Sequence, residues 1–266
     1  MKTNAVSEAH AAYLRRIRRD ARIVFLSRIA VLLGFLLLWE LGADLRWFDP
    51  FILSSPSRVF QTVARLYADG SLWLHVGTTL FETVLGFLLG ALLGALFAVL
   101  LWWMPKLNRI LDPYLVVLNA LPKIALGPVL IVWIGAGTAS IVVMGVLVSL
   151  VVTTVTVLNG FLAATDEKQL LMRTLGATKL QTFLKVVLPA GVPDLISALK
   201  ISVGMSWVGV IVGEYLVSKA GLGYLIVYGG QVFKLDLVMA SVTVLCVLAA
   251  LMYYAVAFLE KKIRGR

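Results

Sequence analysis

Long apolar runs are the feature that most constrains this chain. A helix needs about 20 mainly apolar residues to cross the roughly 30 Å hydrocarbon layer of a membrane, and its backbone polar groups are then paired within the helix. The sequence therefore predicts an all-α membrane protein with six transmembrane helices, in a single domain over residues 1–266. The predicted spans are residues 24–43, 76–103, 113–135, 138–163, 195–217 and 236–259.

Composition excludes a soluble fold. Hydrophobic residues make up 61% of the 266 residues and charged residues only 14%, whereas soluble domains have about 45–50% and about 25%. The net charge of +10 does not predict nucleic-acid binding, because the basic residues lie in short clusters between apolar runs. The single cysteine, Cys246, excludes a disulfide framework, and the isolated His10 and His75 do not predict a metal site.

The distribution of Lys and Arg predicts the orientation. Cytoplasmic loops of membrane proteins carry an excess of these residues. Here most of them lie in residues 1–23, in the polar segment 165–192 and in residues 261–266. We therefore expect both termini and the 165–192 segment to be cytoplasmic. Between the first two spans, residues 56–69 have apolar residues at helical spacing after a Ser-Pro start, which predicts a short helix on the outer membrane surface.

Small residues in the second span predict close helix packing. Gly86, Gly90 and Gly94 recur at every fourth residue and therefore line one helix face, where another backbone can approach closely. The alternative interpretation is a moving contact along a transport pathway.

Prolines interrupt the third span. Pro122 and Pro128 remove backbone donors and predict a break in the helix. Lys123 directly follows Pro122. An ionisable residue at membrane depth is a functional candidate. A structural ion pair of Lys123 with Glu82 or Glu214 is the other open interpretation. For Glu82, pairing with Lys200 is also possible.

The polar segment between the fourth and fifth spans has helical periodicity. Leu170, Leu171 and Leu175 share one face before Gly176, a second apolar set follows it, and Pro189 is expected to end the second half. The pattern predicts two short amphipathic helices joined at a glycine. Such an element can fill a groove on a partner protein.

This segment resembles the signature loop of the inner-membrane permeases of bacterial ABC importers. That signature has a glycine followed thirteen residues later by the proline of an aliphatic-x-Leu-Pro ending, as in Gly176 and Val186-Val187-Leu188-Pro189. The wider sequence is similar to the nitrate/sulfonate/taurine branch of the family, over about residues 50–260. The similar stretches are Pro122-Lys123-Ile124-Ala125-Leu126-Gly127-Pro128, Gly213-Glu214-Tyr215 and Gly221-Leu222-Gly223-Tyr224-Leu225-Ile226.

The resemblance implies a type I importer permease fold (MetI-like) with a cytoplasmic coupling helix, in the bacterial plasma (inner) membrane. It implies that this subunit is not an enzyme and holds no cofactor, because ATP and Mg²⁺ are bound by two copies of a partner ATPase. The chain contains no Gly-Lys dipeptide and hence no Walker loop. The other implied partners are a second permease subunit, either another copy in a homodimer or a close paralogue, together with a solute-binding protein and the lipid bilayer. The implied ATPase-coupling residues are Glu167, Leu171, Arg173, Leu175, Gly176, Ala177, Leu188 and Pro189.

The chain departs from the family pattern at two places. Leu170-Leu171-Met172 stands where the signature usually begins with Glu-Ala-Ala, and Glu82 stands where an arginine is common in this branch. The resemblance implies nitrate, a sulfonate, taurine or bicarbonate as the solute. The acid at position 82 keeps a neutral, pyrimidine-type vitamin precursor among the candidates.

Two other protein classes make different predictions. An ion-gradient-driven secondary transporter predicts internal inverted repeats and paired acids at mid-membrane; no repeat is evident, and the polar loop would have no role. A membrane-embedded enzyme predicts clustered catalytic side chains on facing spans, and none is evident. For a transporter, the residues expected to line the pathway are Asn119, Lys123, Ser206, Trp207 and Glu214. Trp207 has core packing as its alternative role, and Glu214 a capping or pairing role.

Overall fold

The computed structural model describes residues 8–164 and 166–264, and every regular element in these ranges is a helix. By their contacts they divide into two compact units, one ending at Gln61 and one beginning at Thr62. Part of the predicted basic segment 1–23 (residues 1–7), the first residue of the predicted 165–192 loop and residues 265–266 lie outside the described residues. The expectation of a single domain stays a prediction.

The first unit begins with α1 (Glu8–Asp44), a helix of 37 residues. Its section Tyr13–Asp44 is long and apolar enough to cross a membrane, in agreement with the first predicted span. The short α2 (Pro50–Leu53) follows, and the Asp49 carboxylate caps it by accepting a hydrogen bond from the Phe51 N–H at 2.9 Å.

The helix predicted between the first two spans is α3 (Pro56–Ala68). Ser55 precedes it, and its Oγ accepts a hydrogen bond from the Arg58 N–H at 3.5 Å. The Glu40 carboxylate accepts another from the Ser57 N–H at 2.9 Å. Proline suits the first turn because the N–H that it lacks would have no partner within the helix.

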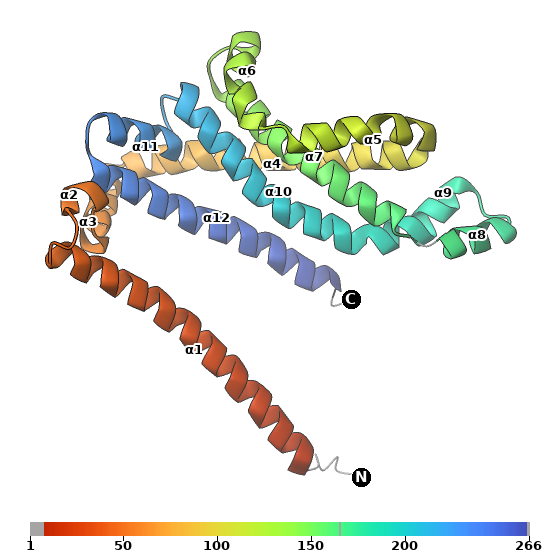
Figure 1. Cartoon of the computed structure of the whole chain (residues 1–266), viewed down its shortest axis with the longest axis horizontal. Coiled ribbons are helices and arrows are strands. Elements are labelled where there is room, and N and C mark those ends of the chain that lie inside the picture. The colour runs from red at the N-terminus through yellow and green to blue at the C-terminus, as the bar shows by residue number, and fades with distance from the viewer. Residues whose placement is uncertain (1–7, 165, 265–266) are drawn as a thin grey trace. The chain divides into compact units, whose positions relative to one another are not determined.

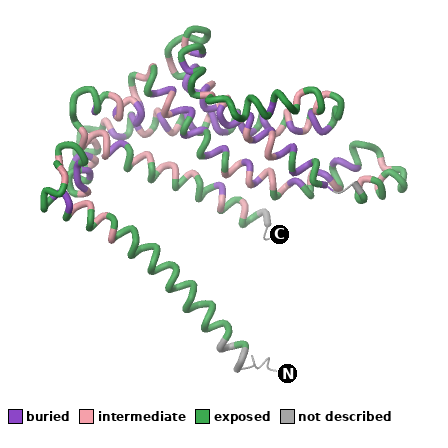
Figure 2. The backbone as a smooth tube through the Cα atoms, viewed as in Figure 1, coloured by how far each residue is buried: buried purple, intermediate pink, exposed green. Residues whose placement is uncertain are grey.

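Five helices form most of the second unit. They are α4 (Ser71–Trp103), α7 (Thr138–Leu162), α10 (Leu188–Val217), α11 (Leu222–Gln231) and α12 (Leu235–Arg264). α7 packs against both α4 and α10, and α12 lies beside α10 and α11 (Figure 1). Buried residues concentrate on α4, α7 and α10 (Figure 2). One apolar cluster contains Val157 and Phe161, and another contains Phe87 and Trp207.

The predicted third span is broken. α5 (Pro105–Ala120) and the segment Lys123–Ile134, which comprises a 3₁₀ turn and α6 (Gly127–Ile134), meet at 88°. Pro122 lies at the break, as its missing backbone donor predicts. The first half begins at Pro105, earlier than the predicted start at residue 113. The described residues thus contain five helices long and apolar enough to cross a membrane, or six candidate spans if the bent pair counts as one.

Gly86, Gly90 and Gly94 of α4 lie at its contact with α7. A Cβ atom on Gly94 would lie 2.7 Å from the Thr153 Cβ and 2.8 Å from the Leu150 carbonyl oxygen. Thr154 Oγ1 donates a hydrogen bond across this contact to the Gly94 carbonyl oxygen at 3.2 Å. The two backbones therefore approach closely because α4 has no side chain at this position.

Replacing Gly94 by alanine is expected to lower the free energy of unfolding by about 1–3 kcal/mol, because the added methyl group has no room against α7. Gly77→Ala, on the same helix, is the matched control, since nothing lies within 4 Å of a Cβ atom there. Thermal unfolding of the detergent-solubilised variants measures the difference. Equal stability of the two variants would contradict the close approach.

Candidate functional site

Between α7 and α10 the chain makes a helical turn at a glycine. α8 (Asp166–Thr174) is followed by Gly176, which has a φ of +73°. The Gly176 N–H donates to the Arg173 carbonyl oxygen at 3.0 Å, and the Ala177 N–H donates to the Met172 carbonyl oxygen at 2.9 Å. This is the Schellman ending, in which a left-handed residue closes a helix and redirects the chain.

The second helix of the segment has its own cap. α9 (Lys179–Thr182) begins with a capping box, in which Thr178 Oγ1 accepts from the Gln181 N–H at 3.2 Å and Gln181 Oε1 accepts from the Thr178 N–H at 2.8 Å. The predicted shape of helix, glycine and helix is therefore present. Each half has a defined end, so the direction of α9 depends on the glycine between them.

The expectation that Pro189 ends the second helix is wrong. The chain passes from α9 through a π-helical turn at Phe183–Val187 directly into α10, and residues 179–217 form one continuous helical segment. A proline is tolerated in the first turn of an α-helix, and the wider π turn before it changes the local pairing of backbone groups. A movement of α9 can therefore pass directly into α10.

Aromatic side chains hold this segment against the end of α4. The centroid of the Phe183 ring lies 4.9 Å from that of Trp102 and 5.5 Å from that of Phe161. Lys179 Nζ donates to the Trp103 carbonyl oxygen at 2.5 Å and lies 5.5 Å from the centroid of the Trp102 ring. The segment is thus tied to α4 and α7 as well as to α10.

The same segment presents apolar side chains to its surroundings. Leu170, Leu171 and Leu175 are 62%, 59% and 73% exposed. α8 and α9 lie at the opposite end of α10 from α11 (Figure 1). A cluster of leucines on a polar helical segment is typical of a surface that another protein covers. Among the other predicted coupling residues, Glu167, Arg173, Gly176 and Pro189 are exposed, and Ala177 and Leu188 are half-buried.

At the other end of α10, three side chains accept hydrogen bonds from the first N–H groups of α11. Such groups have no partner within their own helix. Two of the acceptors reach them from α4 and one from α10. The bonds run from Gly221 N to His75 Nδ1 (3.0 Å), from Leu222 N to Thr79 Oγ1 (2.7 Å) and from Gly223 N to Glu214 Oε2 (2.6 Å).

Glu82 lies beside this cap. Its side chain and that of Glu214 are both 1% exposed, and the two carboxyl groups are close enough to interact. Neither Glu82 oxygen has a hydrogen-bond partner of normal geometry among the described residues. The predicted ion pairs of Glu82 with Lys123 or Lys200 are therefore wrong, and Lys200 pairs with Glu260 instead. Glu214, bonded to a backbone N–H, likewise forms no pair with Lys123.

The five pathway candidates fall into two groups. Asn119 and Lys123 lie at the 88° break, where Lys123 Nζ donates to the Asn119 carbonyl oxygen at 3.1 Å. Asn119 is exposed and Lys123 is half-buried. Ser206, Trp207 and Glu214 are at most 4% exposed. Since a solute can touch only accessible groups, the break offers polar groups in this conformation and the three α10 residues do not.

Sequence reasoning missed His75 and Thr79 as acceptors at the start of α11. An isolated histidine or threonine on an apolar helix carries no signal of its own. The usable signal lies in Gly221-Leu222-Gly223, because a helix that begins inside a bundle needs acceptors for its first N–H groups. That signal predicts a cap but not which distant residues supply it.

The chain thus combines a bundle of apolar helices, one of them broken, with a helix-glycine-helix segment whose exposed leucines are typical of a surface that another protein covers. Residues 86–265 match the family described as the binding-protein-dependent transport system inner membrane component. The chain belongs to this family, and it is a permease subunit of an ABC importer.

Individual relatives agree with this assignment. A "probable ABC transporter permease protein" of Haemophilus influenzae is 33% identical, over 90% of this chain and 96% of that protein. The taurine permease TauC of Escherichia coli is 25% identical (91% and 90% covered), and the formylaminopyrimidine permease ThiX of Halalkalibacterium halodurans is 30% identical (72% and 76%). A chain of the inward-facing methionine transporter MetNI has the same fold, with a TM-score of 0.63 and 22% identity over 72% of this chain and 97% of its own.

Proposed function

We propose that this permease imports a small oxyanionic solute, working as a homodimer with two copies of an ATPase. The observation that carries the proposal is the α8–α9 segment, which combines an exposed leucine patch with a continuous helical connection into α10. An ATPase that holds α8 and α9 in a groove would move α10 when ATP closes it. ATP and Mg²⁺ would then be bound by that partner alone.

The orientation follows from the charges. With the Lys- and Arg-rich segments inside, both termini and the α8–α9 segment face the cytoplasm of a bacterial cell. The loop before α11 and α11 itself then face outward. A solute-binding protein would deliver its cargo at this outer face, over residues 218–235.

A second copy of the chain would complete the pathway. The bent pair α5–α6 carries large apolar side chains that the described residues leave uncovered: Val132 is 82% exposed and Trp133 is 78% exposed. The break between the two helices also brings the polar groups of Asn119 and Lys123 to this region. Two such breaks facing each other would form a polar constriction between apolar surfaces, which a transport pathway needs.

An oxyanion is the solute class that the break favours. Lys123 is the one charged residue of the α5–α6 break, residues 121–126, and it forms no ion pair with the described residues. A cation at a polar opening attracts anions. Relatives that carry taurine and aliphatic sulfonates are consistent with this class. A neutral pyrimidine-type precursor, the cargo type of the relative ThiX, is the other outcome of the test.

The test is uptake by proteoliposomes that contain the permease, its ATPase and its solute-binding protein. Uptake is expected to require internal ATP, to stop with vanadate and to be unaffected by a protonophore. A panel of taurine, an alkanesulfonate, nitrate, bicarbonate and an aminopyrimidine identifies the solute. Uptake driven by an ion gradient without ATP would overturn the proposed mechanism, and selective uptake of the aminopyrimidine would overturn the oxyanion.

Lys123→Met is expected to weaken the apparent affinity for an anionic solute about tenfold, because a hydrogen bond to a charged group contributes about 1.5–3 kcal/mol. Lys123→Arg keeps the charge and serves as the control. The measurement is uptake rate against the concentration of loaded binding protein. Unchanged uptake together with a lower unfolding temperature would mean that Lys123 serves only to hold the Asn119 carbonyl.

A further inference from the structure

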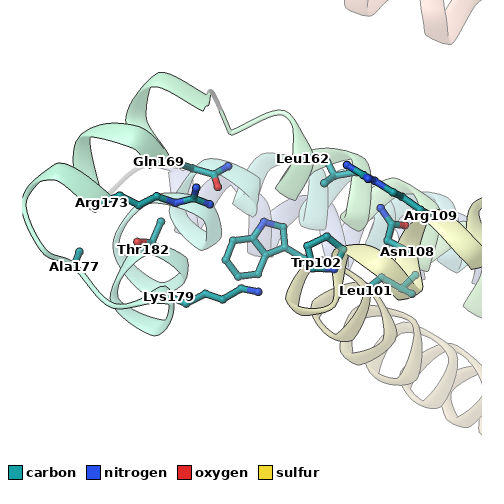
Figure 3. A pocket seen from close by; sticks show the side chains of 11 residues that line it. Leu101, Trp102, Asn108, Arg109, Leu162, Gln169, Arg173, Ala177, Lys179 and Thr182 are labelled. Carbon is teal, nitrogen blue, oxygen red and sulfur yellow. The ribbon is translucent and has the colours of Figure 1, made fainter.

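A pocket of about 660 Å³ lies beside the α8–α9 segment. Its walls come from the end of α4, the start of α5, the end of α7 and the two short helices. Figure 3 shows Gln169, Arg173 and Lys179 reaching toward Trp102 from α8 and α9, with Asn108 and Arg109 on the other side. The proposed ATPase-coupling role explains the exposed leucines but gives no role to the polar and basic side chains of this pocket.

The pocket is strongly cationic. Arg109, Arg173 and Lys179 come from three different helices, and no aspartate or glutamate is among the residues that line it. None of the three forms an ion pair with a residue that the structure describes. Three like charges around one cavity repel each other, so the arrangement favours a bound anion.

An uncharged polar group of the pocket also lacks a partner. The Asn108 Oδ1 atom is buried and makes no hydrogen bond within the described chain. Buried side-chain polar atoms are generally hydrogen-bonded, and a side-chain amide offers donors as well as an acceptor. The pocket therefore has polar groups placed for a ligand that both accepts and donates hydrogen bonds.

The level of the pocket in the membrane indicates the source of the anion. α4 is a mainly apolar helix of 33 residues that ends at Trp102-Trp103, and tryptophans at the end of a span lie at the depth of the lipid headgroups. The pocket contains Trp102 together with Leu101 and Leu162. It thus combines cations at headgroup depth with an apolar wall on the side of the acyl chains.

From this geometry we propose that the pocket binds the headgroup of an anionic phospholipid, with its phosphate between Arg109 and Arg173. Arginine forms paired hydrogen bonds with phosphate oxygens, and basic pockets at the cytoplasmic membrane surface suit such headgroups. The bound lipid would join α5, and so the broken span, to α8. This consequence for transport rests on the proposed coupling role, whereas the lipid site itself does not.

The test uses the full-length permease, alone and in its complex with the ATPase, in nanodiscs of phosphatidylcholine with and without phosphatidylglycerol. Native mass spectrometry measures how much phosphatidylglycerol stays bound after extraction. Arg109→Gln is expected to reduce the retention of phosphatidylglycerol about fivefold, because one Lys or Arg near the membrane surface strengthens the binding of anionic lipid by about this factor. Lys106→Gln is the matched control, because Lys106 is an exposed cation on the same helix outside the pocket. Arg109→Lys is expected to restore part of the retention.

Several outcomes would overturn the proposal. Equal losses in Arg109→Gln and Lys106→Gln would indicate a general attraction of lipids to basic residues. Displacement of the lipid by millimolar inorganic phosphate would indicate a site for free anions. Full lipid retention in Arg109→Gln, with loss of the ATPase from the complex, would assign the pocket to a carboxylate of the ATPase. Thermal unfolding of each variant separates loss of the site from loss of the fold.

Discussion

Gly176→Val is expected to abolish uptake while the permease stays inserted in the membrane at normal levels. Gly176 has a φ of +73°, and nothing lies within 4 Å of a Cβ atom built there. The obstacle is therefore the backbone conformation, because a left-handed residue other than glycine costs about 1–2 kcal/mol and a β-branched one is an outlier. Valine would shift the chain out of this conformation, open the Schellman ending of α8 and change the direction of α9.

The readouts are solute uptake and the stimulation of ATP hydrolysis by loaded binding protein, both in proteoliposomes with the ATPase. We expect uptake to fall by more than about tenfold, equivalent to about 1.4 kcal/mol, and the stimulation to be lost, while basal ATP hydrolysis continues. Gly176→Asn is the control, since asparagine adopts the left-handed conformation at low cost. Normal uptake by the valine variant would mean that the direction of α9 relative to α8 has no role in transport. Equal losses of uptake in the valine and asparagine variants would mean the same.

The architecture follows from the sequence wherever one physical requirement dominates. A backbone in hydrocarbon must pair its own polar groups, so run length alone predicts the spans, and Pro122 predicts the break. The helix-glycine-helix segment is equally local, because a Schellman ending and a capping box depend on neighbouring residues only. These elements needed no knowledge of tertiary contacts.

The errors share one cause, which is dependence on distant residues. Pro189 has the signature of a helix end, but the helical segment continues through this proline. The π turn that precedes it contains Phe183, which packs against α4 and α7. Glu82 has Lys200 and Lys123 as plausible partners by charge, but the fold places it beside another acid, Glu214. Charge alone cannot predict which side chains the helix packing brings together.

The buried acid pair also bears on the choice between transporter classes. Paired acids within the membrane are what the secondary-transporter alternative predicts, and Glu82 with Glu214 forms such a pair. Here, however, Glu214 has a structural task, because it caps α11. The chain belongs to the binding-protein-dependent family, and the energy source that we propose for it is a partner ATPase. Glu214 is thus better explained as part of the cap than as one half of an ion-coupling site.

Glu214→Leu is expected to lower the free energy of unfolding by about 1–3 kcal/mol, because it leaves the buried Gly223 N–H without an acceptor. The carboxyl group also lies at the N-terminal end of α11, where the helix dipole favours an acid. Glu214→Gln keeps an acceptor oxygen of the same shape and should retain most of the stability. For a chain of this size, the leucine variant should unfold roughly 2–4 °C lower for each kcal/mol lost. Uptake should fall as well, since α11 belongs to the surface where a binding protein is proposed to dock.

Two neighbouring threonines provide an independent check of the same cap. Thr79 Oγ1 accepts a hydrogen bond from the Leu222 N–H at 2.7 Å, whereas Thr78 is half-buried and its hydroxyl donates to the Leu74 carbonyl oxygen within its own helix. Thr79→Val is therefore expected to destabilise the protein in the same way as Glu214→Leu, and Thr78→Val to have little effect. Because both residues serve one helix start, the double variant Thr79→Val/Glu214→Leu should lose less stability than the sum of the single losses. Equal effects of the two threonine substitutions would mean that α11 is held by its apolar contacts and not by this cap, whereas strict additivity would mean that the two bonds act independently.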